Sequence, residues 1–254
     1  ELDAILAETY SFPIPATRLP IEGHDVSLLE LYHGPTVAFK DVGAGFLAAC
    51  LTRLEADVDD LLTILVATSG DTGGAVAAAF DGRRGMRVVV LFPDGRVSER
   101  QAHQLCCWSD NVLSLKVQGS FDDCQAMVKA SFSDRGFLPA DRALVAVNSI
   151  NWARIMAQIV YYFWAALALG APQRPVNFSV PTGNFGNVLA AWVARQMGAP
   201  IDRLIVGNNV NHGLSTLIST GRLPLDDVSA SLAPAMDIAI PSNLERYLFE
   251  LFDR

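Results

Sequence analysis

Short runs of β-branched and other apolar residues alternate with helical patterns along most of this 254-residue chain. Consecutive parallel strands must be joined by a long crossover, usually a helix, so this alternation predicts an α/β fold with parallel strands. The predicted strands span residues 61–67, 87–92, 112–117, 143–147, 176–180 and 203–207. The pattern itself is compatible with one doubly wound sheet or with two wound lobes.

Helical patterns fill the gaps between these strands. Residues 43–56 carry leucines at helical spacing, and residues 120–132 begin with Ser120, a good N-cap, followed by acidic residues in the first turn. The uncharged run 155–173 is nearly long enough to span a bilayer. It contains Gln158 and two tyrosines, so we interpret it as a helix buried in an α/β core.

Composition narrows the class of protein. A chain of 254 residues with 51% hydrophobic and 18% charged residues can bury a large core as one big domain or two small ones. The net charge of -8 argues against a nucleic-acid partner, which would require surplus Lys and Arg. The four cysteines lack metal-site or disulfide spacing, and no secretory signal is recognisable, so we expect reduced thiols, no metal site, no membrane partner and a cytoplasmic location.

Two segments run a strand through a turn of small polar residues into a helix. The first turn contains Ser69, Gly70, Asp71, Thr72 and Gly73, and the second contains Gly183, Asn184, Phe185, Gly186 and Asn187. Such a turn directs backbone N–H groups and the positive end of a helix dipole to one point, which suits an anion. The alternative is an ordinary βα turn in which glycine and a capping residue serve the backbone alone. Neither turn has the dinucleotide pattern or the P-loop pattern.

Lys40 lies in HGPTVAFKDVGAG, where its neighbours are uncharged apart from Asp41. A lysine kept among apolar groups has a lowered pKa and offers a neutral amine for a Schiff base. A lysine whose stem covers apolar surface while its ammonium reaches water is the alternative. The combination of one isolated lysine with two anion-binding turns favours pyridoxal phosphate and an amino-acid substrate.

Five segments carry a resemblance to a known family, in that family's order. They read ELYHGPTVAFKDVGAGF, LVATSGDTGGAVAAAF, VNSINWARIMAQIVYYF, VPTGNFGNVLAAW and PAMDIAIPSN. The chain resembles the threonine synthases, pyridoxal-phosphate enzymes of fold type II. The resemblance implies a tryptophan synthase β-like α/β fold of two wound parallel-sheet lobes with helices on both faces. It divides the chain into an N-terminal segment with the lysine (1–59), a smaller lobe (60–148) and part of a larger lobe (149–254).

The resemblance also implies roles for particular residues. Lys40 would form the Schiff base with pyridoxal 5'-phosphate, and Gly183, Asn184, Phe185, Gly186 and Asn187 would hold its phosphate. Ser69, Gly70, Asp71, Thr72 and Gly73 would receive the substrate carboxylate, with Asp71 capping its own helix. Asn148, Asn151 and Arg154, in the segment NSINWAR, would face the site. The alternative for Arg154 is a surface charge at the start of a long helix.

The implied reaction converts O-phospho-L-homoserine and water to L-threonine and phosphate. A phospholyase, a dehydratase and an inactive, cofactor-free domain are the alternatives. Family members are longer at both ends, so we expect a fragment, and the hydroxyl partner of the pyridine nitrogen is not recognisable in it. A monomer and a homodimer are both compatible with the sequence.

Overall fold

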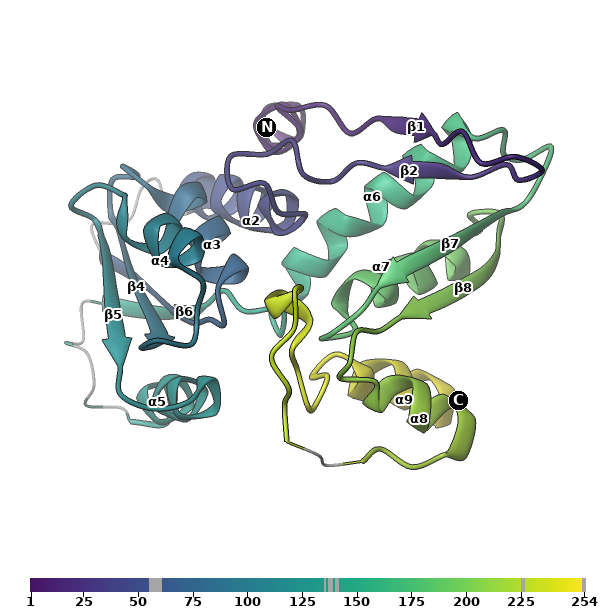
Figure 1. Ribbon diagram of the computed structural model, residues 1–254. Helices are drawn as coiled ribbons and strands as arrows, with labels where there is room; N and C mark the ends of the chain where they lie inside the picture. Colours follow the sequence, from purple (N-terminus) through teal and green to yellow (C-terminus); the bar gives the residue numbers. More distant parts are fainter. Residues whose placement is uncertain (55–60, 135, 137–138, 140–141, 225–226, 253–254) are drawn as a thin grey trace. The chain divides into compact units, whose positions relative to one another are not determined.

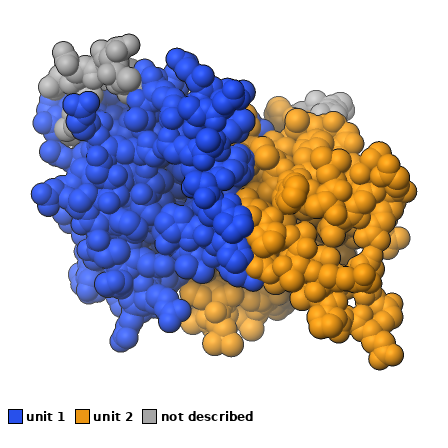
Figure 2. All heavy atoms as spheres, turned by 90° about the horizontal axis from the view of Figure 1, so that it is seen from above, with its two compact units in different colours: residues 1–13, 31–154 blue, residues 14–30, 155–254 orange. Residues whose placement is uncertain are grey.

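The computed structural model describes residues 1–54, 61–134, 136, 139, 142–224 and 227–252 (Figure 1). The chain forms two compact units, which Figure 2 colours separately. Unit 1 comprises Glu1–Pro13 and Leu31–Arg154, and unit 2 comprises Ile14–Glu30 and Ile155–Arg254. The chain thus passes into the main part of unit 2 after Arg154, while the three-part division at 59/60 and 148/149 stays a prediction.

Unit 1 contains a parallel sheet of four strands in the order β5-β4-β3-β6. The strands are β3 (Leu61–Ala67), β4 (Met86–Pro93), β5 (Val112–Val117) and β6 (Arg142–Ala146). Each predicted strand of this sheet is confirmed to within one residue at either end. The α/β class predicted from the alternation is therefore confirmed as well.

Helices cover both faces of this sheet (Figure 1). They are α2 (Lys40–Leu54), α3 (Asp71–Phe80), α4 (Glu99–Cys106) and α5 (Phe121–Ser133). Successive side chains of a strand point to opposite faces, so Ile64 and Val66 pack with α2 and α3, while Leu65 packs with Cys124 and Val128 of α5. Burial on both faces explains why β3 is a continuous apolar run rather than an alternating one.

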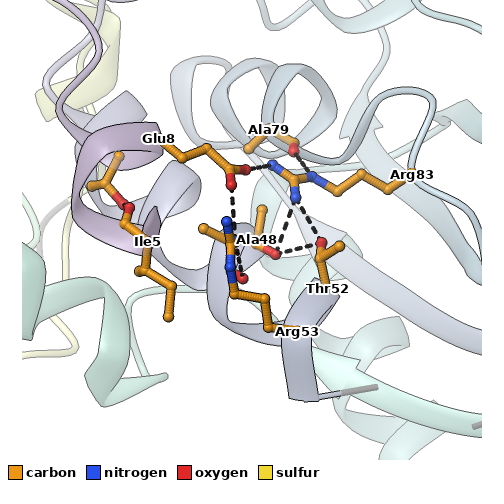
Figure 3. Close-up of polar contacts among 9 residues, drawn as sticks. Ile5, Glu8, Ala48, Thr52, Arg53, Ala79 and Arg83 are labelled. Atoms are coloured by element: carbon orange, nitrogen blue, oxygen red, sulfur yellow. Dashed lines mark hydrogen bonds and ion pairs between the residues drawn. The ribbon is translucent and has the colours of Figure 1, made fainter. Parts of the chain in front are cut away.

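Helix α1 (Leu2–Thr9) is tied to this core by ion pairs (Figure 3). The Glu8 carboxylate accepts hydrogen bonds from Arg53 Nη1 at 2.9 Å and from Arg83 Nη2 at 2.5 Å. Arg83 also donates to Thr52 Oγ1 at 2.6 Å. One carboxylate thereby links α1 to α2 and to the turn after α3.

Unit 2 contains the parallel pair β7 (Val176–Pro181) and β8 (Ile201–Gly207), joined by α7 (Gly186–Gln196). Both strands were predicted, and β8 begins two residues earlier than expected. The remaining elements are α8 (Gly213–Thr220), η1 (Pro234–Met236), α9 (Leu244–Phe252) and the antiparallel pair β1 (Ala16–Arg18) and β2 (Ser27–Leu29). The sequence pattern did not predict β1 and β2, because three-residue strands are too short for a periodicity.

Helix α6 (Trp152–Ala168) is buried on one face only. Ile155, Ile159 and Tyr162 are buried, whereas Met156, Val160, Trp164 and Leu167 form an exposed apolar stripe along the helix. The interpretation of this run as a fully buried helix is therefore wrong for one face. Trp164 Nε1 donates to the carbonyl oxygen of Ile14 at 2.7 Å, which fastens the segment before β1 to this helix.

Two further expectations concern helices. Ser120 is confirmed as the N-cap of α5, since its hydroxyl accepts from the backbone N–H of Asp123. No helix in the described ranges has the length and apolar character needed to cross a membrane.

Candidate functional site

Lys40 is the first residue of α2, and its side chain is only 17% exposed. Its Nζ lies 3.7 Å from Asp71 Oδ2 and 4.7 Å from the centre of the Phe39 ring. Burial lowers the pKa of the Lys40 ammonium. Asp71 and Asp41 oppose this pKa shift, and the Arg154 guanidinium adds to it. The chain has three lysines, and Lys116 is a useful contrast, because it lies 3.7 Å from Asp94 but is 60% exposed.

The loop before Lys40 is held by the next residue, Asp41. Asp41 accepts from the backbone N–H of Thr36 at 2.9 Å and from the Thr36 hydroxyl at 2.5 Å. A Cβ on Gly34 would lie 2.5 Å from Asp41 Oδ2, so only glycine lets the loop close over this carboxylate. Val37 has φ +60°, which is a strained conformation for a β-branched residue. Thr36 and Asp41 were not predicted as site residues, although Asp41 adjoins the lysine.

The turn between β3 and α3 is organised by Thr68. Its hydroxyl accepts from the N–H groups of Gly70 and Gly73, each at 2.9 Å. A Cβ on Gly73 would lie 2.5 Å from the Thr68 methyl group, so the turn requires glycine there. Gly70 is the N-cap of α3, and the Thr68 hydroxyl binds the Gly73 N–H in the first turn, so the sequence prediction that Asp71 caps its own helix is wrong.

Asp71 instead faces Lys40 and Gln101. Its Oδ1 accepts from Gln101 Nε2 at 2.8 Å, and its Oδ2 faces Lys40. Within the described residues, neither the Ser69 nor the Thr72 hydroxyl takes part in a side-chain hydrogen bond. The turn therefore presents two hydroxyls and the N-terminus of α3 beside Asp71, the ion-pair partner of Lys40.

The segment between β6 and α6 supports the same end of the unit 1 sheet. Asn148 Nδ2 donates to the carbonyl oxygen of Ala67 at 3.0 Å, and Asn151 Nδ2 donates to that of Ala146 at 3.1 Å. Arg154 is 3% exposed, and its Nη1 donates to the carbonyl oxygen of Val147 at 2.8 Å. Burial lowers the pKa of Arg154 to about 10, and Asp41 opposes that shift. These predicted substrate residues thus brace the loop through backbone carbonyls.

In unit 2, the turn 183–187 joins β7 to α7. Phe185 has φ +64°, which places it in the left-handed region, and no side chain caps the helix at this residue. Val37 and Phe185 are the non-glycine residues with positive φ in the described part of the chain, and each lies in a predicted site segment. Strained backbone of this kind clusters at ligand sites. The Phe185 ring packs against Tyr247 of α9, with centroids 5.5 Å apart.

The asparagine side chains of this turn are anchors. Asn184 Oδ1 accepts from the backbone N–H of Ser242 at 2.6 Å and from its hydroxyl at 2.7 Å. Asn187 Oδ1 accepts from the hydroxyls of Tyr161 and Tyr162 at 2.5 and 2.9 Å. Both side-chain oxygens are therefore engaged within unit 2. An anion is bound by hydrogen-bond donors, so the phosphate-binding role of this turn stays a prediction.

The glycines of the same turn make close approaches. A Cβ on Gly183 would lie 2.8 Å from Met236 Cα, and one on Gly186 would lie 3.2 Å from Ile155 Cδ1. Glycine at these positions lets the turn pack closely against Met236 and Ile155 at the start of α7. The turn is thus a backbone cradle at a helix N-terminus.

A buried lysine at a helix start and two strand-to-helix turns built around glycine define a class of cofactor-dependent α/β enzymes. The chain belongs to the pyridoxal-phosphate dependent enzyme family, whose model matches residues 10–254. It is 52% identical over 257 residues to the threonine synthase of Pseudomonas aeruginosa, an alignment that covers 98% of this chain and 54% of that protein.

Solved structures agree with this relationship. A crystal structure of PLP-bound threonine synthase from Brucella melitensis matches with a TM-score of 0.88 and 46% identity, covering 99% of this chain and 55% of that one. The threonine synthase of Escherichia coli matches with a TM-score of 0.88 and 40% identity, covering 98% and 58%. The chain spans about half the length of these relatives.

Proposed function

We propose that this chain binds pyridoxal 5'-phosphate through Lys40 and carries part of the site that converts O-phospho-L-homoserine and water to L-threonine and phosphate. The observation that carries the proposal is the Lys40 amine, which is buried, has a lowered pKa and lies 3.7 Å from Asp71 at the start of α2. The 52% identity to a threonine synthase supports the choice of reaction.

The residues present fit the cofactor. A phosphate monoester needs several converging N–H donors, and α7 offers its first turn without a side-chain cap at Phe185, in a turn whose glycines pack against Met236 and Ile155. A Schiff base needs an amine that loses its proton readily, which burial provides for Lys40. When bound, the cofactor supplies an electron sink next to the substrate α-carbon.

The chain's own residues would bind the substrate and move protons. The Ser69 and Thr72 hydroxyls at the N-terminus of α3 are suited to the substrate carboxylate. The N–H groups of Gly70 and Gly73 donate to the Thr68 hydroxyl, so these glycines would shape the turn. Asp71 is not suited to it, because two carboxylates repel each other. Asn148, Asn151 and Arg154 would shape this end of the site through the carbonyl oxygens that they bind. Lys40, whose pKa is lowered by burial, would accept and return protons at carbon.

The cofactor proposal is tested by absorbance, borohydride reduction and peptide mapping of the chain mixed with pyridoxal phosphate. We expect a visible band and a reduced adduct on the peptide containing Lys40, both lost in Lys40→Ala. Lys116→Ala is the matched control, since Lys116 has the same distance to an aspartate but is exposed. An adduct on Lys116 or Lys129, or no adduct at all, contradicts the proposal.

The reaction is tested by product analysis with O-phosphohomoserine. Threonine and phosphate in equal amounts are expected. Release of phosphate with 2-oxobutyrate and without threonine identifies a phospholyase instead.

Three further features stay predictions. The chain would act on a small molecule without a nucleic-acid partner, in the cytoplasm, as a monomer or a homodimer. The four cysteines are free thiols, which supports a reducing compartment. Light scattering on the purified chain measures the oligomeric state.

A further inference from the structure

We infer that Gln101 is a positioning residue, which holds the Asp71 carboxylate beside the Lys40 amine. All three residues lie in unit 1. Gln101 has no motif signal, and it is 30 residues away from Asp71 along the chain. The inference rests on the proposed function only in taking Lys40 as the reactive amine.

The orientation of the Gln101 amide is determined by the start of α4. Ser98 and Gln101 form a capping box, in which Gln101 Oε1 accepts from the Ser98 backbone N–H at 3.0 Å and the Ser98 hydroxyl accepts from the Gln101 backbone N–H. A side-chain amide has one acceptor end and one donor end. Because the capping box uses the oxygen, the NH₂ group is directed to Asp71 Oδ1 at 2.8 Å.

The packing around this amide is close. Gln101 is 7% exposed, although it is a polar residue on a short helix. Gly70 has φ +140°, and a Cβ there would lie 2.2 Å from Gln101 Nε2. Glycine is therefore required at position 70 for two reasons: it adopts the positive φ of the turn, and it leaves room for the Gln101 amide.

The hydrogen bond from Gln101 fixes the orientation of the Asp71 carboxylate. Its side chain is 28% exposed, so a carboxylate held by Lys40 alone could rotate toward water. The hydrogen bond from Gln101 occupies Oδ1 and leaves Oδ2 facing Lys40 Nζ. Gln101 therefore acts on Lys40 through Asp71 and does not touch the amine itself.

A second glutamine on the same face of α4 strengthens the argument. Gln104, one turn further along, donates from Nε2 to the carbonyl oxygen of Thr36 at 3.1 Å. Thr36 in turn holds Asp41, the residue after Lys40. Helix α4 thus contacts the surroundings of Lys40 at two points.

The charged groups that act on Lys40 are Asp71, Asp41 and Arg154. Gln101 bonds to Asp71 alone among these three. Asp71 raises the pKa of Lys40. Loss of the glutamine should therefore weaken this influence of Asp71 and leave those of Asp41 and Arg154 unchanged. A glutamine that merely capped α4 would not affect Lys40.

The test measures the Lys40 pKa without cofactor, by NMR of the chain labelled at lysine Cε. Three lysine signals are expected, and the Lys40 signal is identified by its loss in Lys40→Ala. We expect Gln101→Met to lower the Lys40 pKa by about one unit, and Asp71→Asn to lower it by about one to two units. In the double variant, Gln101→Met should add no further shift to Asp71→Asn, because both changes act through one group.

Ser98→Ala is the control for helix capping. It removes the capping hydroxyl but leaves the Gln101 donor, so it should lower the unfolding midpoint without moving the Lys40 pKa. The inference is overturned if Gln101→Met leaves this pKa unchanged, if it shifts the pKa equally in the Asp71→Asn background, or if Ser98→Ala shifts it as much.

A measurement on the unmodified chain covers the case in which Gln101→Met does not fold. The Gln101 side-chain amide resonance should move as Lys40 titrates, and its failure to do so also overturns the inference. Because these measurements contain no pyridoxal phosphate, failure of cofactor binding and failure of the positioning role give different results.

Discussion

The candidate site segment of unit 1 and that of unit 2 use their polar side chains in different ways. In unit 1, the side chains of Lys40 and Asp71 face each other, and that of Gln101 donates to the carboxylate. In unit 2, the side-chain oxygens of Asn184 and Asn187 accept hydrogen bonds from Ser242 and from two tyrosines. A group proposed to transfer protons needs a tuned charge, whereas a turn proposed to bind a phosphate needs converging N–H donors, and the two segments differ accordingly.

The largest effect is expected from a methyl group in the unit 2 cradle. Gly183→Ala places a Cβ 2.8 Å from Met236 Cα, so the backbone must shift. We expect pyridoxal-phosphate affinity to fall at least about tenfold, since a displaced N–H donor loses a charge-assisted hydrogen bond worth roughly 1.5–3 kcal/mol. The measurement is an absorbance titration with the cofactor.

Gly207→Ala is the matched control for this change. Its Cβ would find only ordinary contacts, the nearest at 3.6 Å, at the end of the neighbouring strand. If Gly207→Ala lowered the affinity for pyridoxal phosphate as much as Gly183→Ala, the loss would not be specific to the turn 183–187.

The anchoring role of Asn187 predicts a loss of stability. Asn187→Ala leaves two tyrosine hydroxyls without this acceptor, and burial raises the pKa of Tyr162, so its hydroxyl keeps its proton and needs a partner. We expect the free energy of unfolding to fall by about 1–3 kcal/mol in urea titrations. Asn177→Ala is the control, because it removes an exposed hydrogen bond from the Arg203 N–H. It should lower the free energy of unfolding by less than Asn187→Ala does. Equal losses would contradict the anchoring role.

The smallest effect is expected in unit 1 away from the lysine. The pKa of Glu8 depends on two opposing influences. Burial raises this pKa, but the hydrogen bonds from Arg83 and Arg53 lower it by more, so the pKa lies below its usual value. A carboxyl group whose pKa is lower in the folded than in the unfolded chain stabilises the fold at any pH above its unfolded-state pKa. This stabilisation is lost as the pH falls through the folded-state pKa. Glu8→Gln should therefore reduce the free energy of unfolding by about 1 kcal/mol at pH 7, because the pair is partly exposed.

Thermal unfolding between pH 7 and pH 3 measures this difference, which should disappear at the acid end. The exposed Glu22 provides the control, and Glu22→Gln should change stability little at any pH. A difference for Glu8→Gln that grows toward low pH would contradict the ion-pair account.

The sequence by itself determined the six parallel strands β3 to β8 and the two glycine-rich turns, and it singled out Lys40 as the candidate amine. Those features depend on local rules, because period-two and helical patterns, turn glycines and an isolated charge can each be recognised within about ten residues. The α/β class and the family resemblance followed from them and are confirmed.

Only the tertiary structure decided which polar groups meet. Gln101 reaches Asp71 across 30 positions, Gln104 reaches Thr36 across 68, and the exposed stripe of α6 depends on which elements pack against it. The partner of a polar side chain is set by the packing of distant elements, which no local pattern records. For the same reason, the sequence did not predict that the side-chain oxygens of Asn184 and Asn187 hold the turn in place, while the role of this turn in binding the cofactor stays a prediction.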